Sequence, residues 1–191
     1  MMAEESLKTG VMGERGRGPF AIYNYDPEWP NKFQAHARII KAALGDAALR
    51  IEHVGSTSVP GLGAKPIIDI LLVVADSTHE SIYLPQLEAA GYVLRMREPD
   101  WNEHRMVRTP EKDVHIHIYS AGCAEIQRNL MFRDRLRRNI DDRRRYEQTK
   151  RELAPREWAS HQGYSDAKTD VIEKIIAAAQ REIDEQHVAD Q

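Results

Sequence analysis

Residues 53–70 read HVGSTSVPGLGAKPIIDI, a loop of small residues between two apolar segments that we expect to be β-strands. Glycines without a Cβ let the backbone approach a ligand closely, and the loop has three of them, Gly55, Gly61 and Gly63. Three hydroxyls and one mobile positive charge come from Ser56, Thr57, Ser58 and Lys65. This combination suits the phosphates of a nucleotide, so the loop is the first candidate for a binding site.

Asp69 is a lone carboxylate in the apolar run 67–74, which we expect to be a central strand covered on both faces. An ionised carboxylate in such a place costs several kcal/mol unless it is paired or binds a metal ion. One hypothesis is a Mg²⁺ or Mn²⁺ ligand that brings the metal to the phosphates of a nucleotide. The alternative is a structural ion pair with Lys65 or with an arginine from the C-terminal half.

The segment 113–119 alternates between apolar and polar residues, which predicts a strand with one polar face. That face carries Asp113, His115, His117 and Tyr119. Two histidines at this spacing can share a transition metal such as Zn²⁺ or Mn²⁺, or one can act as a general base near neutral pH. The alternative is a solvated sheet face whose histidines only form local hydrogen bonds.

A basic segment lies at 128–151, with ten basic residues against four acidic ones. Arg133 and Arg137 are four residues apart, so they share a helix face that could hold a triphosphate or the phosphates of a larger partner. The alternative is an ordinary solvated charged helix. Further on, Lys168 follows Tyr164 by one helical turn, and apolar neighbours on that helix can hold the lysine in place.

Length and composition indicate one domain, which we expect at 20–186, between a disordered tail at 1–19 and a short tail at 187–191. The formal net charge of −3 and the pI near 6.2 argue against binding to long nucleic acid. The one cysteine, Cys123, excludes an internal disulfide, and no apolar stretch reaches the ~20 residues of a membrane helix. We therefore expect a cytoplasmic protein that does not associate with membranes.

Apolar periodicity and turn residues predict a sheet first and helices afterwards. Strands are expected at 20–25, 49–54, 67–74, 92–97, 103–109 and 113–119. Helices are expected at 28–44, about 77–90, and roughly 123–139, 142–153 and 165–186, with Pro155 and Gly163 as breaks. A mixed sheet followed by a helical layer makes the predicted fold class α+β.

Five segments, taken in order, make the chain resemble the GrpB family. They are EHVGSTSVPGLGAKPIIDI (52–70), HIH (115–117), FRDRLRRN (132–139), YEQTKREL (146–153) and YSDAKTDVI (164–172). Members of this family are small bacterial proteins with a nucleotidyltransferase-like fold that also occur fused to dephospho-coenzyme A kinases. The resemblance covers about 20–180 and implies a nucleotidyltransferase-like mixed sheet flanked by helices, with a C-terminal helical layer.

The resemblance also implies a site. Nucleotidyltransferases of this fold use a Gly-Ser pair before a strand with two carboxylates two residues apart, and these help to hold two metal ions. By resemblance, Gly55-Ser56 takes the position of the pair and Asp69 that of the first carboxylate. Leu71 stands where the second carboxylate is expected. A two-metal site therefore needs a replacement ligand, for which the candidates are His115, His117 and Glu52.

The first functional hypothesis is an enzyme that transfers a nucleotidyl group from a nucleoside triphosphate to a small-molecule acceptor. Its candidate catalytic residues are Asp69, Lys65, His115 and His117, of which Asp69 and the histidines would hold the metal. Its candidate phosphate-binding residues are Gly55, Ser56, Thr57, Ser58, Lys65, Arg133, Arg137 and Lys168. The second hypothesis is a non-catalytic nucleotide-binding, chaperone-like or regulatory module, and the third is metal-dependent phosphate hydrolysis centred on the histidines.

Overall fold

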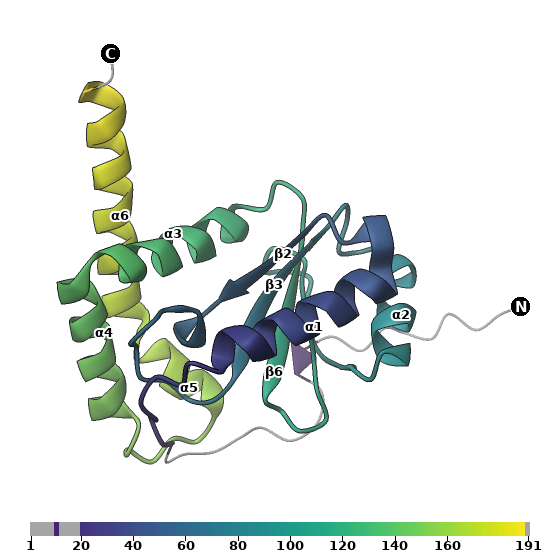
Figure 1. Ribbon diagram of the computed structural model, residues 1–191, viewed down its shortest axis with the longest axis horizontal. Helices are drawn as coiled ribbons and strands as arrows, with labels where there is room; N and C mark the ends of the chain where they lie inside the picture. Colours follow the sequence, from purple (N-terminus) through teal and green to yellow (C-terminus); the bar gives the residue numbers. More distant parts are fainter. Residues whose placement is uncertain (1–9, 12–19, 190–191) are drawn as a thin grey trace, which may run out of the picture.

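In the computed structural model of the chain, we describe residues 10–11 and 20–189. The elements follow one another from the N-terminal strand to a long C-terminal helix (Figure 1). The strands are β1 (Gly10–Val11), β2 (Arg50–Val54), β3 (Ile68–Val74), β4 (Val93–Glu98), β5 (His104–Arg108) and β6 (Val114–Ser120). The α-helices are α1 (Trp29–Leu44), α2 (Leu84–Ala89), α3 (Ala124–Arg138), α4 (Ile140–Leu153), α5 (His161–Asp166) and α6 (Thr169–Ala189). Three short 3₁₀ helices are η1 (Gly45–Ala47), η2 (Ser56–Ser58) and η3 (Glu80–Ile82).

The sheet is mixed, with the strand order β1-β4-β5-β6-β3-β2. Only β3 and β6 run parallel, and every other neighbouring pair among the described strands is antiparallel. In the parallel pair Asp69 lies beside His115, and Leu71 lies beside His117. Because paired residues share a face of the sheet, this register brings the predicted carboxylate and both predicted histidines to one side.

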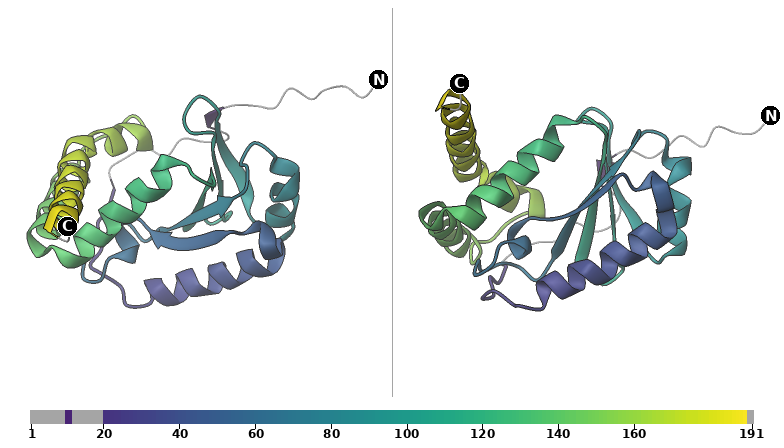
Figure 2. Two further views of the ribbon diagram at one scale, coloured as in Figure 1. Left: turned by 90° about the horizontal axis from the view of Figure 1, so that it is seen from above. Right: turned by 45° about the horizontal axis from the view of Figure 1, so that its top comes forward.

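The opposite face of the sheet packs on α1 and α2. Trp29, Phe33, Ile40 and Leu44 recur at helical spacing along α1 and are buried in one cluster with Ile68, Ile70 and Leu72 of β3 and Ile116 and Ile118 of β6. Figure 2 shows α1 along this face, with α3 on the other side of the sheet. The prediction that β3 is covered on both faces is confirmed, since Leu71 and Val73 pack on α3 instead.

The C-terminal helices form a second layer next to the sheet. Helices α3, α4 and α6 enclose a cluster that also takes in the glycine-rich loop, with Val59, Leu62, Leu136, Tyr146 and Ile175 buried in it. This cluster joins the loop to the helices, so the loop has a fixed position. The predicted α+β fold class is thus confirmed: the chain forms a mixed sheet with flanking helices and a C-terminal helical layer.

Two predicted elements are wrong in extent. The segment 20–25 is not a strand, because it makes a single bridge, between Tyr23 and Ala64. Pro66, which follows that bridge, lacks the N–H that a longer ladder would need. The helix expected at about 77–90 is reduced to η3 and the short α2, which has Pro85 in its first turn.

The C-terminal region and the tails also differ from expectation. Gly163 does not break a helix but lies inside α5, and α6 continues to Ala189, beyond the expected end at 186. Of the expected N-terminal tail, Gly10–Val11 pair with β4, and residues 1–9 and 12–19 lie outside the described residues. None of the described helices combines the length and apolar character that crossing a membrane requires.

Candidate functional site

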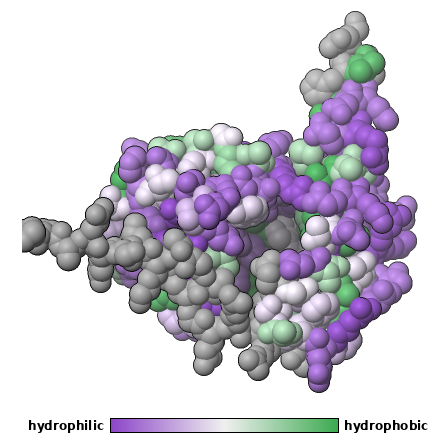
Figure 3. Space-filling model, turned by 180° about the vertical axis from the view of Figure 1, so that it is seen from behind, coloured by the Kyte–Doolittle hydropathy of each residue, from purple (hydrophilic) through white to green (hydrophobic). Residues whose placement is uncertain are grey.

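A cleft of about 720 Å³ lies at the face of the sheet that carries the predicted site. Its walls come from the loop after β2, from β3, β4, β5 and β6, and from α3, α4, α5 and α6. The polar side chains that line it are Ser56, Lys65, Asp69, Glu98, His104, His115, His117, Tyr119, Glu125, Arg128, Asn129, Tyr146, Lys150, Tyr164, Ser165, Asp166, Lys168 and Thr169. Seen from behind, the molecule is hollowed near its middle and hydrophilic residues dominate the surrounding surface (Figure 3).

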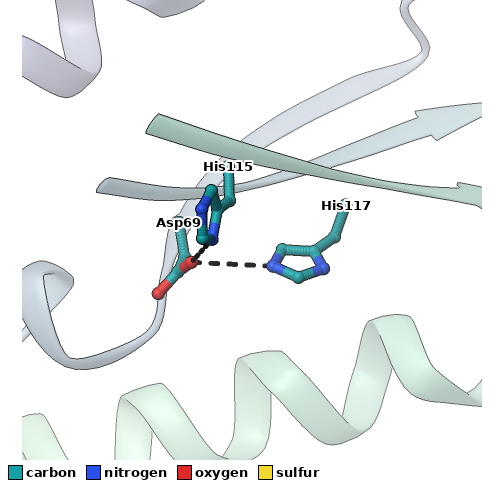
Figure 4. A group of neighbouring side chains, drawn as sticks. All are labelled: Asp69, His115 and His117. Carbon is teal, nitrogen blue, oxygen red and sulfur yellow. Dashed lines mark ion pairs between the residues drawn. The ribbon is translucent and has the colours of Figure 1, made fainter. Parts of the chain in front are cut away.

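Asp69 and the two histidines converge at the centre of the cleft. The Oδ1 atom of Asp69 lies 3.7 Å from Nδ1 of His115 and 3.6 Å from Nε2 of His117 (Figure 4). One ligand atom from each residue lies within 4.8 Å of the other two. Two ligands on a tetrahedral ion, each ~2.1 Å from it, are separated by roughly 3.4 Å. The spacing of the three side chains therefore fits a single metal ion.

The electrostatic environment of Asp69 and His115 favours the protonation states in which these side chains can bind a metal ion. Burial lowers the pKa of His115 to about 4, although the charge of Asp69 opposes the shift, so the imidazole is neutral at neutral pH. For Asp69, burial favours the neutral form, but the interaction with His117, together with the charges of His115 and Lys65, outweighs burial and lowers the pKa of Asp69. An ionised carboxylate beside a neutral imidazole is the protonation state that binds a cation.

A second histidine layer lies behind His117. Its Nδ1 lies 3.1 Å from Nε2 of His104, and Nδ1 of His104 lies 2.7 Å from Oε2 of Glu98. His104 is buried, its ring stacks on that of Tyr119, and burial lowers its pKa to about 2. The row Asp69–His117–His104–Glu98 thus runs from the centre of the cleft to its rim.

Three lysines gather at the other end of the cleft, on the side of the glycine-rich loop. The ammonium groups of Lys65 and Lys168 lie 4.9 and 4.3 Å from the centre of the Tyr164 ring. Lys150 donates to Oγ of Ser56, 3.0 Å away, and to the carbonyl of Gly63. Burial and the charges of neighbouring cations, Lys168 first among them, lower the pKa of Lys150 to about 7. Burial and the charge of Lys65 lower that of Lys168 to about 8.

The same end of the cleft holds an unused hydrogen-bonding group. Tyr164 is 1% exposed, and among the described residues its hydroxyl has no hydrogen-bond partner. Buried polar groups in proteins are almost always paired, so this hydroxyl, on a ring that contacts the ammonium groups of Lys65 and Lys168, is a candidate donor to a ligand. Sequestered positive charge and a free donor together are the chemistry of a phosphate site.

The Gly-Ser pair lies where the resemblance implies. Gly55 has φ +67° and ψ −173°, a conformation open essentially to glycine alone. A Cβ at this position would meet the carboxylate of Asp69, with its Cγ only 3.1 Å away. Gly55 is therefore required both by the backbone and by the carboxylate, and Ser56 next to it faces the cleft.

Four predicted phosphate-binding residues have other roles. Thr57 and Ser58 are buried, and their hydroxyls donate to the carbonyls of Ile67 and Gly55. Arg133 is engaged by the carboxylates of Glu52 and Asp134 and by the carbonyl of His53, and Arg137 donates to the carbonyl of Ser58. None of the four is among the residues that line the cleft. Arg133 and Arg137 hold β2 and the loop against α3, whereas the hydroxyls of Thr57 and Ser58 form hydrogen bonds within the loop.

The expected second carboxylate is absent, and its position is closed. Leu71 is fully buried against α3, and Glu52, the acidic candidate to replace the carboxylate, is occupied by Arg133 and Arg50. Among the candidates, only the two histidines join Asp69. The alternative of an arginine partner for Asp69 is not borne out by the ion pairs of the described residues, which join Asp69 to His115 and His117.

Sequence reasoning missed three residues of the site. Lys150 was counted only as part of the basic segment, although it follows Tyr146 by one helical turn and both positions are buried. That spacing could have placed both on an inward face of α4. His104 and Glu98 were missed because they come from β5 and β4, and only the register of the meander brings them beside His117.

Fold and site together define an α+β protein whose mixed sheet carries a carboxylate–imidazole group beside a lysine-lined cleft. The family model described as GrpB protein matches residues 19–178. The chain belongs to the GrpB family.

Relatives and solved structures agree with that assignment. A UPF0157 protein of Halalkalibacterium halodurans is 49% identical over 178 residues, covering 92% of this chain and 91% of the relative. A dephospho-CoA kinase of Mycolicibacterium paratuberculosis is 30% identical over 166 residues, but the match covers 73% of this chain and only 41% of the kinase. The crystal structure of a conserved protein GrpB from Enterococcus faecalis superimposes with a TM-score of 0.75 and 34% identity, over 85% of this chain and 99% of that one.

Proposed function

We propose that the chain binds a nucleoside triphosphate in the cleft and transfers its nucleotidyl group to a small-molecule acceptor with the help of a divalent metal ion. The observation that carries this proposal is the meeting of three partly or fully buried lysines with the Asp69–His115–His117 group in one cleft. Three clustered, partly or fully buried cations at one end suit phosphates, and a metal group at the centre suits their activation.

The lysine end would take the phosphates. In addition to burial, the charges of Lys168 and Lys65 lower the pKa of Lys150, and the charge of Lys65 lowers that of Lys168. A bound polyphosphate would relieve this repulsion. Ser56 and the unpaired hydroxyl of Tyr164 add hydrogen bonds at the same end. The rest of the cleft, toward Arg128, leaves space for the acceptor.

The metal ion would lie between Asp69, His115 and His117, where it would polarise the phosphate that is attacked. In the transfer, an acceptor hydroxyl forms a bond to the α-phosphorus, the bond from that phosphorus to the bridging oxygen breaks, and pyrophosphate leaves. The hydroxyl proton would pass to solvent water, because the lone pairs of both imidazoles would be taken up by the metal ion. The lysines neutralise the charge that develops on pyrophosphate.

The test is pyrophosphate release from each of the four nucleoside triphosphates with Mg²⁺ or Mn²⁺ and a fractionated pool of cell metabolites. We expect release that depends on the metabolite fraction and falls at least ~100-fold in Asp69→Asn, which keeps the shape but removes the charge. Thr78→Val, on the exposed turn before η3, serves as a control and should not change the rate. Release that is absent, or equal in Asp69→Asn, would contradict the enzyme.

One observation favours a second function, a non-catalytic nucleotide-binding module. The buried Leu71 leaves the group without the second carboxylate that two-metal catalysis uses. In that case a triphosphate still binds to the lysines, and its affinity survives in Asp69→Asn but is lost in Lys150→Met. Equilibrium titration of both variants, with no acceptor present, separates the module from the enzyme.

A further inference from the structure

His104 and Glu98, which lie behind the candidate metal group, determine which ring nitrogen of His117 can bind a metal ion. A neutral imidazole carries one N–H, and the hydrogen bond at one ring nitrogen decides which nitrogen keeps the lone pair. His104 contacts Glu98 through Nδ1 and His117 through Nε2, so it connects the two.

The carboxylate of Glu98 determines which ring nitrogens of His104 and His117 carry a hydrogen. An ionised carboxylate only accepts, so His104 donates from Nδ1 to Glu98, 2.7 Å away. The other nitrogen of neutral His104, Nε2, must then accept, and the donor to it is Nδ1 of His117 at 3.1 Å. When His117 is neutral, this leaves its lone pair on Nε2.

The lone pair on Nε2 of His117 faces another hydrogen-bond acceptor, the carboxylate of Asp69. Nε2 of His117 lies 3.6 Å from Oδ1 of Asp69, which is too far for a hydrogen bond and wide enough for an ion between them. His115 approaches the same oxygen with its Nδ1 at 3.7 Å. Acceptors that face one another across such a gap are stabilised by a cation.

We propose that Glu98 and His104 are positioning residues that fix His117 as an Nε2 ligand, so that the site takes a transition-metal ion such as Mn²⁺ or Zn²⁺ in preference to Mg²⁺. This inference rests on the metal site of the proposed function. Two imidazole nitrogens and one carboxylate oxygen suit such ions, whereas Mg²⁺ is usually held by oxygen ligands. Mutation of a residue that forms a hydrogen bond to a metal ligand typically lowers metal affinity 10–100-fold.

The first test is spectroscopic. In protein labelled with ¹⁵N at histidine, we expect His117 to show a protonated Nδ1 and an unprotonated Nε2 at neutral pH without metal. Addition of Zn²⁺ should shift the Nε2 resonance and leave Nδ1 protonated. The opposite order, with Glu98 as the donor and the hydrogen of His117 on Nε2, would overturn the inference.

The second test measures metal affinity by calorimetry with Mn²⁺, Zn²⁺ and Mg²⁺, with no nucleotide present. Glu98→Leu removes the acceptor and should weaken Mn²⁺ and Zn²⁺ binding at least ~10-fold, whereas Glu98→Gln keeps an accepting oxygen and should stay within about 3-fold of wild type. His104→Phe keeps a ring against Tyr119 but loses both nitrogens, and should match Glu98→Leu.

His36→Phe is the matched control, because His36 is also a partly buried histidine with one hydrogen bond, to Tyr92, but it lies on α1. It should bind metal like wild type. Equal affinity in Glu98→Leu and wild type, or Mg²⁺ bound as tightly as Mn²⁺ and Zn²⁺, would overturn the inference. Triphosphate binding measured in the presence of EDTA, which removes divalent metal ions, reports on the lysines alone. A failure of Glu98 and His104 to position His117 can therefore be distinguished from a failure of the proposed nucleotide site.

Discussion

At the scale of single residues, the conformation of Gly55 and the buried charge of Lys150 are both suited to a ligand in the cleft. Gly55 is pressed against Asp69 by a backbone conformation that other residues avoid, and Lys150 is 3% exposed with a depressed pKa. The depressed pKa of Lys150 reduces the stability of the folded chain taken alone at neutral pH, and a bound anion would reverse that cost.

Gly55→Ala should damage the metal site more than the fold. The change forces a Cβ into the carboxylate of Asp69, which must turn away, so metal affinity should fall at least ~10-fold. Backbone strain should cost roughly 1–3 kcal/mol of unfolding free energy. Gly61→Ala is the control, since Gly61 has φ +76° but no atom within 4 Å of the added Cβ. It should lose stability, as measured by denaturant titration, and keep its metal affinity.

Triphosphate affinity should fall as pH rises above 7. In the free protein Lys150 has a pKa of about 7, lowered by burial and by Lys168, Arg151 and Lys65 and partly restored by Glu147, and a bound polyphosphate needs it protonated. Calorimetry between pH 6 and 9 should show an affinity loss of roughly 10-fold or more, with a weaker loss in Lys150→Met. An affinity that is independent of pH would show that Lys150 does not contact the ligand.

The lowered pKa of Lys150 makes the stability of the free protein depend on pH in the opposite direction to the triphosphate affinity. Between the folded pKa of about 7 and the ordinary lysine value, the unfolded chain binds the proton and the folded chain does not. The contribution of Lys150 to the free energy of unfolding therefore increases as pH rises above 7. In the variant Lys150→Met this contribution disappears.

At the scale of elements, the arginines of α3 connect it to the sheet. Arg133 lies between α3 and β2, with Glu52 and the carbonyl of His53 as partners, and Arg137 reaches the loop at Ser58. Helix α3 also covers Leu71 and Val73 of β3. The position of the glycine-rich loop therefore depends on α3, which contributes Arg128 and Asn129 to the cleft.

Arg133→Ala should destabilise the fold without abolishing ligand binding. Removal of the guanidinium leaves Glu52 and a buried carbonyl without their partner, which should lower the free energy of unfolding by about 2–3 kcal/mol. Arg138→Ala on the same helix, whose side chain is exposed, should change it by less than about 0.5 kcal/mol. Denaturant unfolding measures both, and triphosphate affinity of folded Arg133→Ala should stay close to wild type.

Much of the element pattern could be predicted, and the reasons for the failures are physical. The strands β3 and β6 and the shared face of His115 and His117 follow from local periodicity, whereas the meeting of these histidines with Asp69 depends on the parallel pairing of the two strands. The roles of Arg133 and Lys150 could not be told apart, because a basic run on two helices does not say which side chain faces the loop. That choice is made by how α3 and α4 pack, which is a property of tertiary structure.

At the scale of the whole molecule, the site draws on segments from both halves of the chain. The loop after β2, the strands β3 and β6, and helices α4 and α6 all supply groups to one cleft. The hydrophobic clusters join these parts, since the cluster around Val59 and Leu62 includes residues of α3, α4 and α6. Ligand binding should therefore stabilise the described domain as one unit.

A triphosphate with a divalent metal should raise the melting temperature in a single transition. At a ligand concentration of 100 times the Kd, the stabilisation is about 2.7 kcal/mol, which for a chain of this length corresponds to roughly 5–10 °C. Differential scanning calorimetry with and without ligand measures the shift. Two separated transitions, with only one of them moved, would contradict a single cooperative domain.

The parallel pairing of β3 with β6 has a consequence for how the chain gains its chemistry. Parallel neighbours cannot be joined by a tight turn, and here α2 and the β4–β5 hairpin intervene before β6 is added beside β3. Contacts between such distant segments form late, because closing the intervening chain costs entropy that only the finished sheet offsets. We therefore expect His115 and His117 to reach Asp69 late in folding. A nascent or partly unfolded chain would then lack the assembled Asp69–His115–His117 group, so the proposed capture of a metal ion would coincide with the native state.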